Sequence, residues 1–137
     1  MTSTDELIVP RVAKMLEADT CSRALGIVVR TAREGRALAT ATVSEELTNG
    51  HQIAHGGLIF ALADTALACA ANSLVPGTVT AESSIIFLAP AHVGDELVAE
   101  ATVRSTTGRH TVIDVTVRSA ERVIAEFRGR GTARNRS

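Results

Sequence analysis

The segment from Leu58 to Ser73 constrains the fold of this chain more than any other, because its only charged side chain is Asp64. The many alanines in it favour a helix and leave room for close approach of a neighbouring backbone. A membrane-spanning helix needs about 20 apolar residues, whereas this run is shorter and contains a carboxylate. We therefore expect a long helix over about residues 56–73 that is buried in the core of a domain.

The length and charge of the chain exclude several classes of protein. At 137 residues it can form one domain with a real core, spanning residues 1–137, but not two. Its formal net charge of -1 provides no basic surplus for nucleic acid. The N-terminal segment has no apolar core of the signal-peptide kind, so we expect a cytoplasmic protein. Two cysteines, Cys21 and Cys69, are too few for a disulfide framework or a zinc site, and we expect reduced, semi-buried thiols.

A shorter helix is expected at the N-terminus. Ser3 and Glu6 have the spacing of a capping box, and apolar residues recur at helical spacing as far as Asp19. This predicts a helix over about residues 5–18, which Pro10 could break. The last residues, about 133–137, are expected to form a flexible tail.

The remaining segments predict strands. Residues 27–43 contain β-branched residues and alternation on both sides of a turn at Glu34 and Gly35, which predicts two strands. Turn signals after the central helix cut the rest into four more strands. These signals are Pro76–Thr78, Pro90–Asp95, Thr107–Arg109 and Ala120–Arg122.

One of these strands shows the pattern of a sheet with unlike faces. Leu97, Ala99, Ala101 and Val103 alternate with a mostly polar set, the period of two of an antiparallel sheet. A strongly apolar helix beside about six such strands is buried only if the sheet curls around it. The expected fold is therefore α+β, with a long central helix wrapped by a curled antiparallel sheet of about six strands.

Asp64 needs a reason to lie in an apolar helix, because an unpaired buried charge is costly. One interpretation is structural: the carboxylate caps a second helix beginning at Thr65, or points into water. The other is functional, since a carboxylate that loses solvation becomes a stronger base or nucleophile. The preceding His55–Gly57 favours the second, because glycines at a helix start leave free N–H groups that can stabilise an oxyanion.

Distance then limits where such a site can form. Gly56 and Asp64 are eight positions apart, which is about 12 Å along one helix. They cannot act on one carbonyl within one chain. Two copies packed around a two-fold axis with antiparallel helices would bring the start of one helix to the middle of the other.

The residues around Asp64 also resemble a known family. The segment NGHQIAHGGLIFALADTALACAANS closely resembles the signature of the hotdog-fold acyl-CoA thioesterases of the phenylacetic-acid-degradation (PaaI-type) group. The resemblance extends from CSRALGI through IIFLAPAHVGDELVAEATV to FRGRGT. It implies a hotdog fold, homodimers with shared active sites that pair into homotetramers, and hydrolysis of small acyl-CoA thioesters without a cofactor or metal. Phenylacetyl-CoA and its hydroxylated derivatives are candidate substrates.

The resemblance assigns roles to five residues. Asp64 corresponds to the catalytic carboxylate, and Gly56 to the amide that polarises the thioester carbonyl. Asn49 and His55 correspond to the polar residues at the mouth of that helix. Thr80 falls where some related thioesterases place a hydroxyl that helps to orient water.

The chain departs from the family pattern at two places. Leu67 and Ala68 stand where the group often has an aromatic pair, and Ala89 stands where it can have an arginine. The first departure bears on aryl specificity and the second on a contact to CoA. With three phenylalanines and no Tyr or Trp, the sequence predicts an acyl pocket built mainly from aliphatic contacts.

Several alternatives stay open at this level. Asp64 can serve as a general base or as a nucleophile. The rival function is that of a non-catalytic acyl-CoA-binding or sensing protein of the same fold, and a hotdog hydratase is a second enzyme candidate. Asn49 and Gly50 can form a simple turn, and His55 can simply fix the loop by a hydrogen bond. Arg128 and Arg130 can meet CoA phosphates or protect a strand edge from aggregation.

Overall fold

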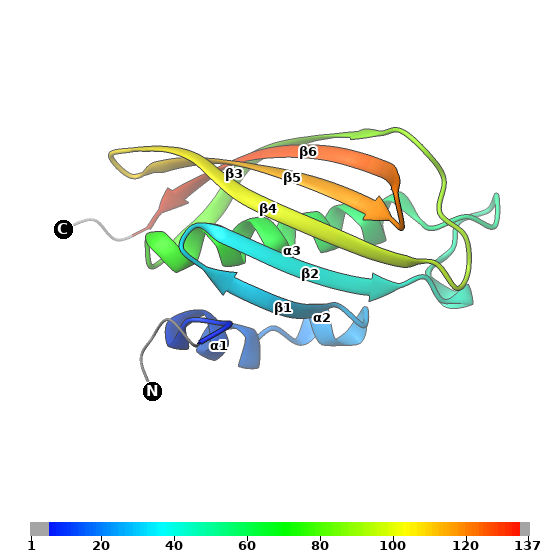
Figure 1. The fold of residues 1–137 in the computed structure, drawn as a ribbon, viewed down its shortest axis with the longest axis horizontal. Coiled ribbons are helices and arrows are strands. Elements are labelled where there is room, and N and C mark those ends of the chain that lie inside the picture. Colours follow the sequence, from blue (N-terminus) through cyan, green and yellow to red (C-terminus); the bar gives the residue numbers. More distant parts are fainter. Residues whose placement is uncertain (1–5, 135–137) are drawn as a thin grey trace.

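A computed structural model describes residues 6–134 of the protein, in which one long helix lies against a six-stranded antiparallel sheet (Figure 1). The strands follow the order β1-β2-β4-β5-β6-β3 across the sheet. The helices are α1 (Pro10–Glu17), α2 (Thr20–Ala24), the short 3-10 helix η2 (Glu45–Leu47) and α3 (Gly56–Leu74). The strands are β1 (Val28–Arg33), β2 (Arg36–Thr42), β3 (Thr78–Phe87), β4 (Glu96–Thr107), β5 (His110–Ser119) and β6 (Arg122–Ala133).

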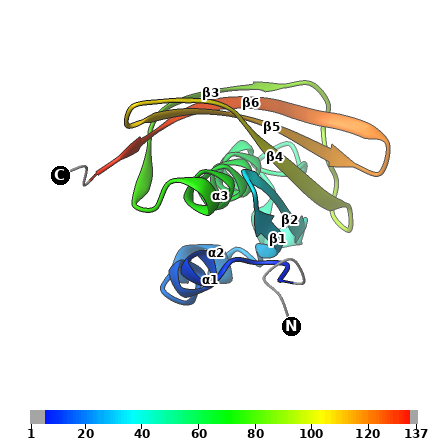
Figure 2. The same cartoon turned by 60° about the vertical axis from the view of Figure 1, so that its left-hand side comes forward.

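The apolar segment forms α3, as expected from its composition. Figure 2 shows α3 lying in the hollow of the curved sheet, with α1 and α2 on the opposite side of α3 from β5 and β6. By length and hydropathy alone α3 could cross a membrane, but 61% of its most apolar window is buried inside the protein. It is therefore the core helix of this fold.

The strands lie where the turn signals and the alternation predict them. In β4, Leu97, Ala99 and Ala101 are buried while Glu100 is exposed, which confirms the two unlike faces. The helix approaches β6 very closely, because Gly129 faces Leu67. A Cβ at Gly129 would lie 2.5 Å from Leu67 Cδ1. The glycine at position 129 thus lets the helix pack against the sheet, whereas a Cβ at Gly131 would meet Thr78 of β3 instead.

The N-terminal helix differs from the expected one. It begins at Pro10 instead of residue 5, because proline lacks an N–H and suits the first turn of a helix rather than its interior. Ser3 of the predicted capping box lies outside the described residues. A second helix, α2, follows directly, with Asp19 as its cap accepting a hydrogen bond from the Ser22 amide at 2.9 Å.

The N-terminal helices hold the far end of α3. Arg11 donates hydrogen bonds to the carbonyl oxygens of Asn72 and Ser73, at 2.8 and 2.6 Å. The last carbonyls of a helix have no N–H partner inside the helix, and a cation near them is also stabilised by the negative end of the helix dipole.

The C-terminus differs from the expected flexible tail at Ala133, which still pairs with Thr78 as part of β6. Residues 135–137 lie outside the described chain.

The edge strand β3 leaves apolar surface uncovered. Within residues 6–134 it pairs only with β6, so its other edge has no strand partner. Val79, Ile86 and Phe87 of this strand are 43%, 63% and 51% exposed. Unpaired backbone beside exposed apolar side chains is the kind of edge that pairs with another chain.

Candidate active site

The carboxylate of Asp64 is held by a hydroxyl from the neighbouring strand. Asp64 lies half-buried near the middle of α3, and Thr80 lies near the start of β3. Thr80 Oγ1 donates a hydrogen bond to Asp64 Oδ1 at 2.8 Å. The contact arises because β3 turns back along α3 after the Pro76–Gly77 turn. The structure therefore brings together two of the residues that the family resemblance singled out.

The start of α3 holds a free backbone donor. His55 is its N-cap, and Nδ1 of His55 accepts a hydrogen bond from the Gly57 amide at 2.8 Å. Since that nitrogen is an acceptor, it carries no proton in this arrangement. The sequence predicted free N–H groups at both glycines after His55. The Gly57 N–H is bonded to His55, however, so of the two only the Gly56 N–H finds no acceptor within residues 6–134.

Asn49 shapes the loop in front of this helix. Its Oδ1 accepts hydrogen bonds from the amides of His51, at 2.8 Å, and Ile53, at 3.4 Å. The backbone N–H of Asn49 donates to the Ile53 carbonyl oxygen at 2.9 Å. This is the turn that the Asn49–Gly50 pair suggested. The side chain nevertheless lines the same groove as Gly56.

That groove, of about 490 Å³, runs between the loop before α3 and the segment after β3. Its side chains are apolar apart from that of Asn49. The lining consists of Asn49, Ile53, Ala54, Gly56, Ile59, Phe87, Leu88, Ala89, Pro90 and Ala91. A concave apolar surface with few polar groups is the usual form of a small-molecule site.

Phe87 was not among the residues singled out from the sequence, yet it lies against Gly56 in this groove. A Cβ at Gly56 would lie 3.1 Å from Phe87 Cζ, so the tip of the ring rests against the glycine. The one available signal was a phenylalanine in the quoted segment IIFLAPAH. Leu67, by contrast, is fully buried against β6 and does not line the groove. The departure from the family pattern at Leu67 therefore does not change the lining of this groove.

The candidate residues fall into two groups within one chain. Asn49, His55 and Gly56 lie at the N-terminal end of α3, whereas Asp64 and Thr80 lie two turns further along. Neither Asp64 nor Thr80 lines the groove beside Gly56. Within one chain the five candidate residues therefore form two separate groups.

Neither cysteine lines the groove beside Gly56. Cys69 is fully buried and Cys21 is exposed, so the expectation of two semi-buried thiols is wrong. Burial raises the pKa of the Cys69 thiol to about 12, which keeps it protonated and unreactive. Among residues 6–134, no group of three or more His, Cys, Asp or Glu side chains has the arrangement of a metal site.

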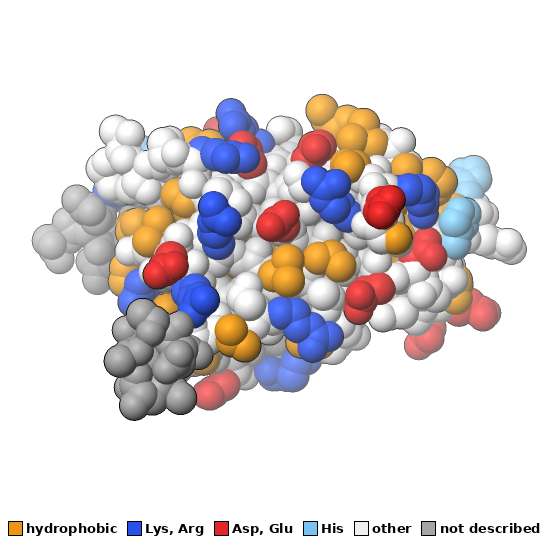
Figure 3. Space-filling model, in the orientation of Figure 1, with side chains coloured by type: hydrophobic (Ala, Val, Ile, Leu, Met, Phe, Trp, Pro, Cys, Tyr) orange, Lys and Arg blue, Asp and Glu red, His pale blue; other side chains and the backbone are white. Residues whose placement is uncertain are grey.

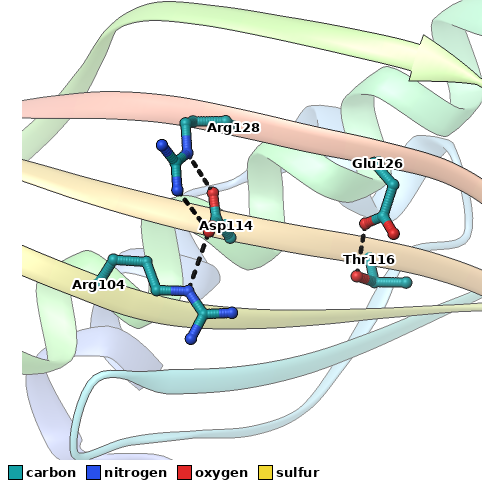
Figure 4. Close-up of polar contacts among 5 residues, drawn as sticks. All are labelled: Arg104, Asp114, Thr116, Glu126 and Arg128. Atoms are coloured by element: carbon teal, nitrogen blue, oxygen red, sulfur yellow. Dashed lines mark hydrogen bonds and ion pairs between the residues drawn. The ribbon is translucent and has the colours of Figure 1, made fainter.

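Arg128 and Arg130 of β6, the candidates for contacts with CoA phosphates, do not line the groove beside Gly56. Figure 3 shows basic and acidic side chains interspersed over the sheet face that is turned away from α3. On this face Arg128 binds both carboxylate oxygens of Asp114, and Arg104 binds one of them at 2.9 Å (Figure 4). Beside them Thr116 donates to Glu126 at 2.6 Å. The single carboxylate of Asp114 therefore compensates one of the two positive charges of Arg104 and Arg128.

A long helix inside a curled six-stranded antiparallel sheet is the architecture of the hotdog fold. A family model described as "Thioesterase superfamily" matches residues 51–126, and the chain belongs to this family. This confirms the family and the fold predicted from the sequence.

Its similarity to individual proteins is also extensive. The chain is 43% identical, over 117 residues, to the acyl-coenzyme A thioesterase PaaI of Escherichia coli strain K12, covering 85% of this chain and 84% of that protein. The solved structure of the E. coli PaaI protein, from the phenylacetic acid degradation operon, superimposes with a TM-score of 0.86 at 39% identity, covering 91% of both chains. A Streptococcus mutans UA159 protein solved with bound acetyl-CoA is 26% identical, with a TM-score of 0.74, over 80% of this chain and 90% of that one.

Proposed function

We propose that the protein hydrolyses small acyl-CoA thioesters to the free acid and CoA. The observation that carries this proposal is the free amide of Gly56 at the start of α3, beside an apolar groove and on the same helix as Asp64. The likeness to the E. coli acyl-coenzyme A thioesterase supports the same reaction. The acetyl-CoA bound to the S. mutans relative supports the same class of ligand.

In the proposed reaction, Gly56 N–H donates to the thioester carbonyl oxygen and stabilises the negative charge that develops there. As a general base, Asp64 takes a proton from water while the water oxygen bonds to the carbonyl carbon. The tetrahedral intermediate then breaks its C–S bond, and the proton goes to the departing CoA sulfur. As a nucleophile, Asp64 would instead bond to the carbonyl carbon and break the C–S bond, so that CoA leaves as its thiolate; water then hydrolyses the resulting anhydride to the free acid and the Asp64 carboxylate. In both routes Thr80 holds the carboxylate in place, and no cofactor or metal is needed.

The proposed active unit is a homodimer that completes each site with both chains. Gly56 and Asp64 lie about 12 Å apart along α3, too far to meet on one carbonyl. A two-fold axis that brings Asp64 of the partner subunit to Gly56 would pass midway between these positions, beside Phe60. Phe60 is 37% exposed, and its ring packs edge-to-face against Phe127, with ring centroids 5.1 Å apart.

The edge strand is compatible with the same axis. Thr80 is bonded to Asp64, and Phe87 rests on Gly56. An axis that exchanges these two ends therefore crosses β3 midway between them, beside Ser83 and Ser84. Antiparallel pairing of two β3 edges around that point would cover the exposed apolar side chains of the strand and satisfy its backbone groups.

Further association and location also belong to the proposal. The family resemblance implies that two such dimers pair into a homotetramer, which sedimentation of the purified protein would measure. We also propose that the protein is cytoplasmic, as expected from its sequence. Phenylacetyl-CoA and its hydroxylated derivatives are the first substrates to test.

The deciding experiment is a panel of acyl-CoA substrates with detection of the released thiol. We expect turnover of several short acyl and arylacetyl thioesters, with modest discrimination, because one methylene changes selectivity by only about 10- to 200-fold. Tight binding of acyl-CoA with no release of thiol from any substrate would instead favour the non-catalytic binding protein.

A further inference from the structure

Phe87 lies directly beside the proposed oxyanion donor. Ring atoms Cζ, Cε1 and Cε2 of Phe87 lie 3.1, 3.6 and 3.7 Å from the point where a Cβ of residue 56 would be. Phe87 as a residue is 51% exposed, and it lines the groove. We propose that Phe87 is the residue that selects the acyl group, by forming the wall against which that group packs; this inference rests on the proposed thioesterase function.

The backbone fixes this ring relative to Gly56. Phe87 is the last residue of β3 and pairs with Ala125 of β6. Directly after it, the Leu88 amide donates to the Ile124 carbonyl at 2.8 Å. The loop before α3 is tied to the same segment, because the Ala54 amide donates to the Ala91 carbonyl at 2.8 Å. The two walls of the groove therefore hold the ring and the donor at a set separation.

The chemistry of the groove favours the acyl group over the pantetheine arm of CoA. The pantetheine arm carries two amides, which lose water on binding and need hydrogen-bond partners. The groove offers one polar side chain, that of Asn49, and its Oδ1 already accepts two hydrogen bonds. An acyl chain or an aryl ring needs no such partners and gains from contact with Ile53, Ile59 and the Phe87 ring.

Acyl groups that differ in reach provide the test. We would measure kcat/KM for acetyl-CoA, hexanoyl-CoA and phenylacetyl-CoA with the unmodified protein, Phe87→Leu and Phe87→Ala, together with inhibition by free CoA. Val93→Ala is the matched control, because Val93 is similarly exposed, at 54%, and does not line the groove. Thermal melting of each variant shows that it is folded.

We expect Phe87→Ala to lower kcat/KM for phenylacetyl-CoA by about 10- to 100-fold, since the larger group loses a contact wall. Hexanoyl-CoA should lose less, acetyl-CoA less than about threefold, and Phe87→Leu should be intermediate. Inhibition by CoA should not change, and Val93→Ala should behave as the unmodified protein. Equal losses for all three substrates, or weaker inhibition by CoA, would overturn the assignment.

If the proposed thioesterase function is wrong, the experiment gives a different result from the one that overturns the assignment of Phe87. In that case the unmodified protein would release no thiol from any of the three substrates. The assignment of Phe87 would then be decided by the dissociation constants of non-hydrolysable thioether analogues bearing the same acyl groups. Selective weakening of the arylacetyl analogue by Phe87→Ala supports it, and uniform weakening contradicts it.

Discussion

At the scale of single residues, Asp64 carries the strongest prediction. Asp64→Asn removes the charge but keeps an oxygen that can accept the hydrogen bond of Thr80. We expect turnover to fall by about 10²- to 10⁴-fold, as for loss of a general base, or further if Asp64 is the nucleophile. The fold should survive, and loss of a partly buried charge can raise the melting temperature. Turnover and melting temperature are measured on one preparation, and an active but destabilised variant would remove Asp64 from the mechanism.

The hydroxyl of Thr80 is expected to act through Asp64 rather than on the substrate. Thr80→Val keeps the shape of the side chain and removes the donor at 2.8 Å from Oδ1. Since hydrogen bonds to charged groups contribute about 1.5–3 kcal/mol, we expect kcat to fall by about tenfold or more with little change in KM. Thr80→Ser restores the donor and serves as the control. If both variants lose the same activity, the hydroxyl has no such role.

At the scale of secondary-structure elements, the start of α3 depends on its cap. His55 Nδ1 accepts from the Gly57 amide, so His55→Ala leaves that amide without its side-chain partner. We expect a loss of about 1 kcal/mol in the free energy of unfolding, measured by urea titration. His55→Ser supplies another capping oxygen and should keep most of the stability. If His55→Ser restores stability but not turnover, His55 has a role in the site beyond the cap.

The outer face of the sheet gives a prediction about pH. Hydrogen bonds from Arg128 and then Arg104 hold the pKa of Asp114 below its usual range. The stabilisation is therefore fully present above the unfolded carboxyl pKa of about 3.9 and is lost as the pH falls through the lower folded pKa. Asp114→Asn should cost at most about 1 kcal/mol near neutral pH, since this is a surface network. Urea unfolding of both proteins should show the difference shrinking in acid; a difference that does not depend on pH would contradict this.

At the scale of the whole molecule, the shared site can be tested by complementation. Asp64→Ala and Gly56→Pro each break both sites of their own dimer, because proline lacks the backbone donor. A hybrid of the two has one intact site, formed by Gly56 of the first chain and Asp64 of the second. Random exchange makes about half of the dimers hybrid, so about a quarter of the unmodified activity should return. Differently tagged chains report hybrid formation, and inactive hybrids would refute the shared site.

Much of the fold was predictable because its signals are local. The apolar run around Asp64 predicts a buried helix, and the alternation from Leu97 onward predicts strands with one buried face. Turn residues such as Gly35 mark where strands end, because few residues adopt the positive φ found there. The family resemblance, which the comparisons confirm, pointed to Asp64, Gly56, Asn49, His55 and Thr80, whose catalytic roles stay predictions.

Only the tertiary structure decided how these residues meet. The sequence alone does not show that His55 satisfies Gly57 and leaves Gly56 free, because this depends on the rotamer of a capping side chain. Likewise, the contacts of Thr80 with Asp64 and of Phe87 with Gly56 join residues far apart in the chain. They exist because β3 turns back along α3, and the register of that return is set by pairing with β6 rather than by any local pattern.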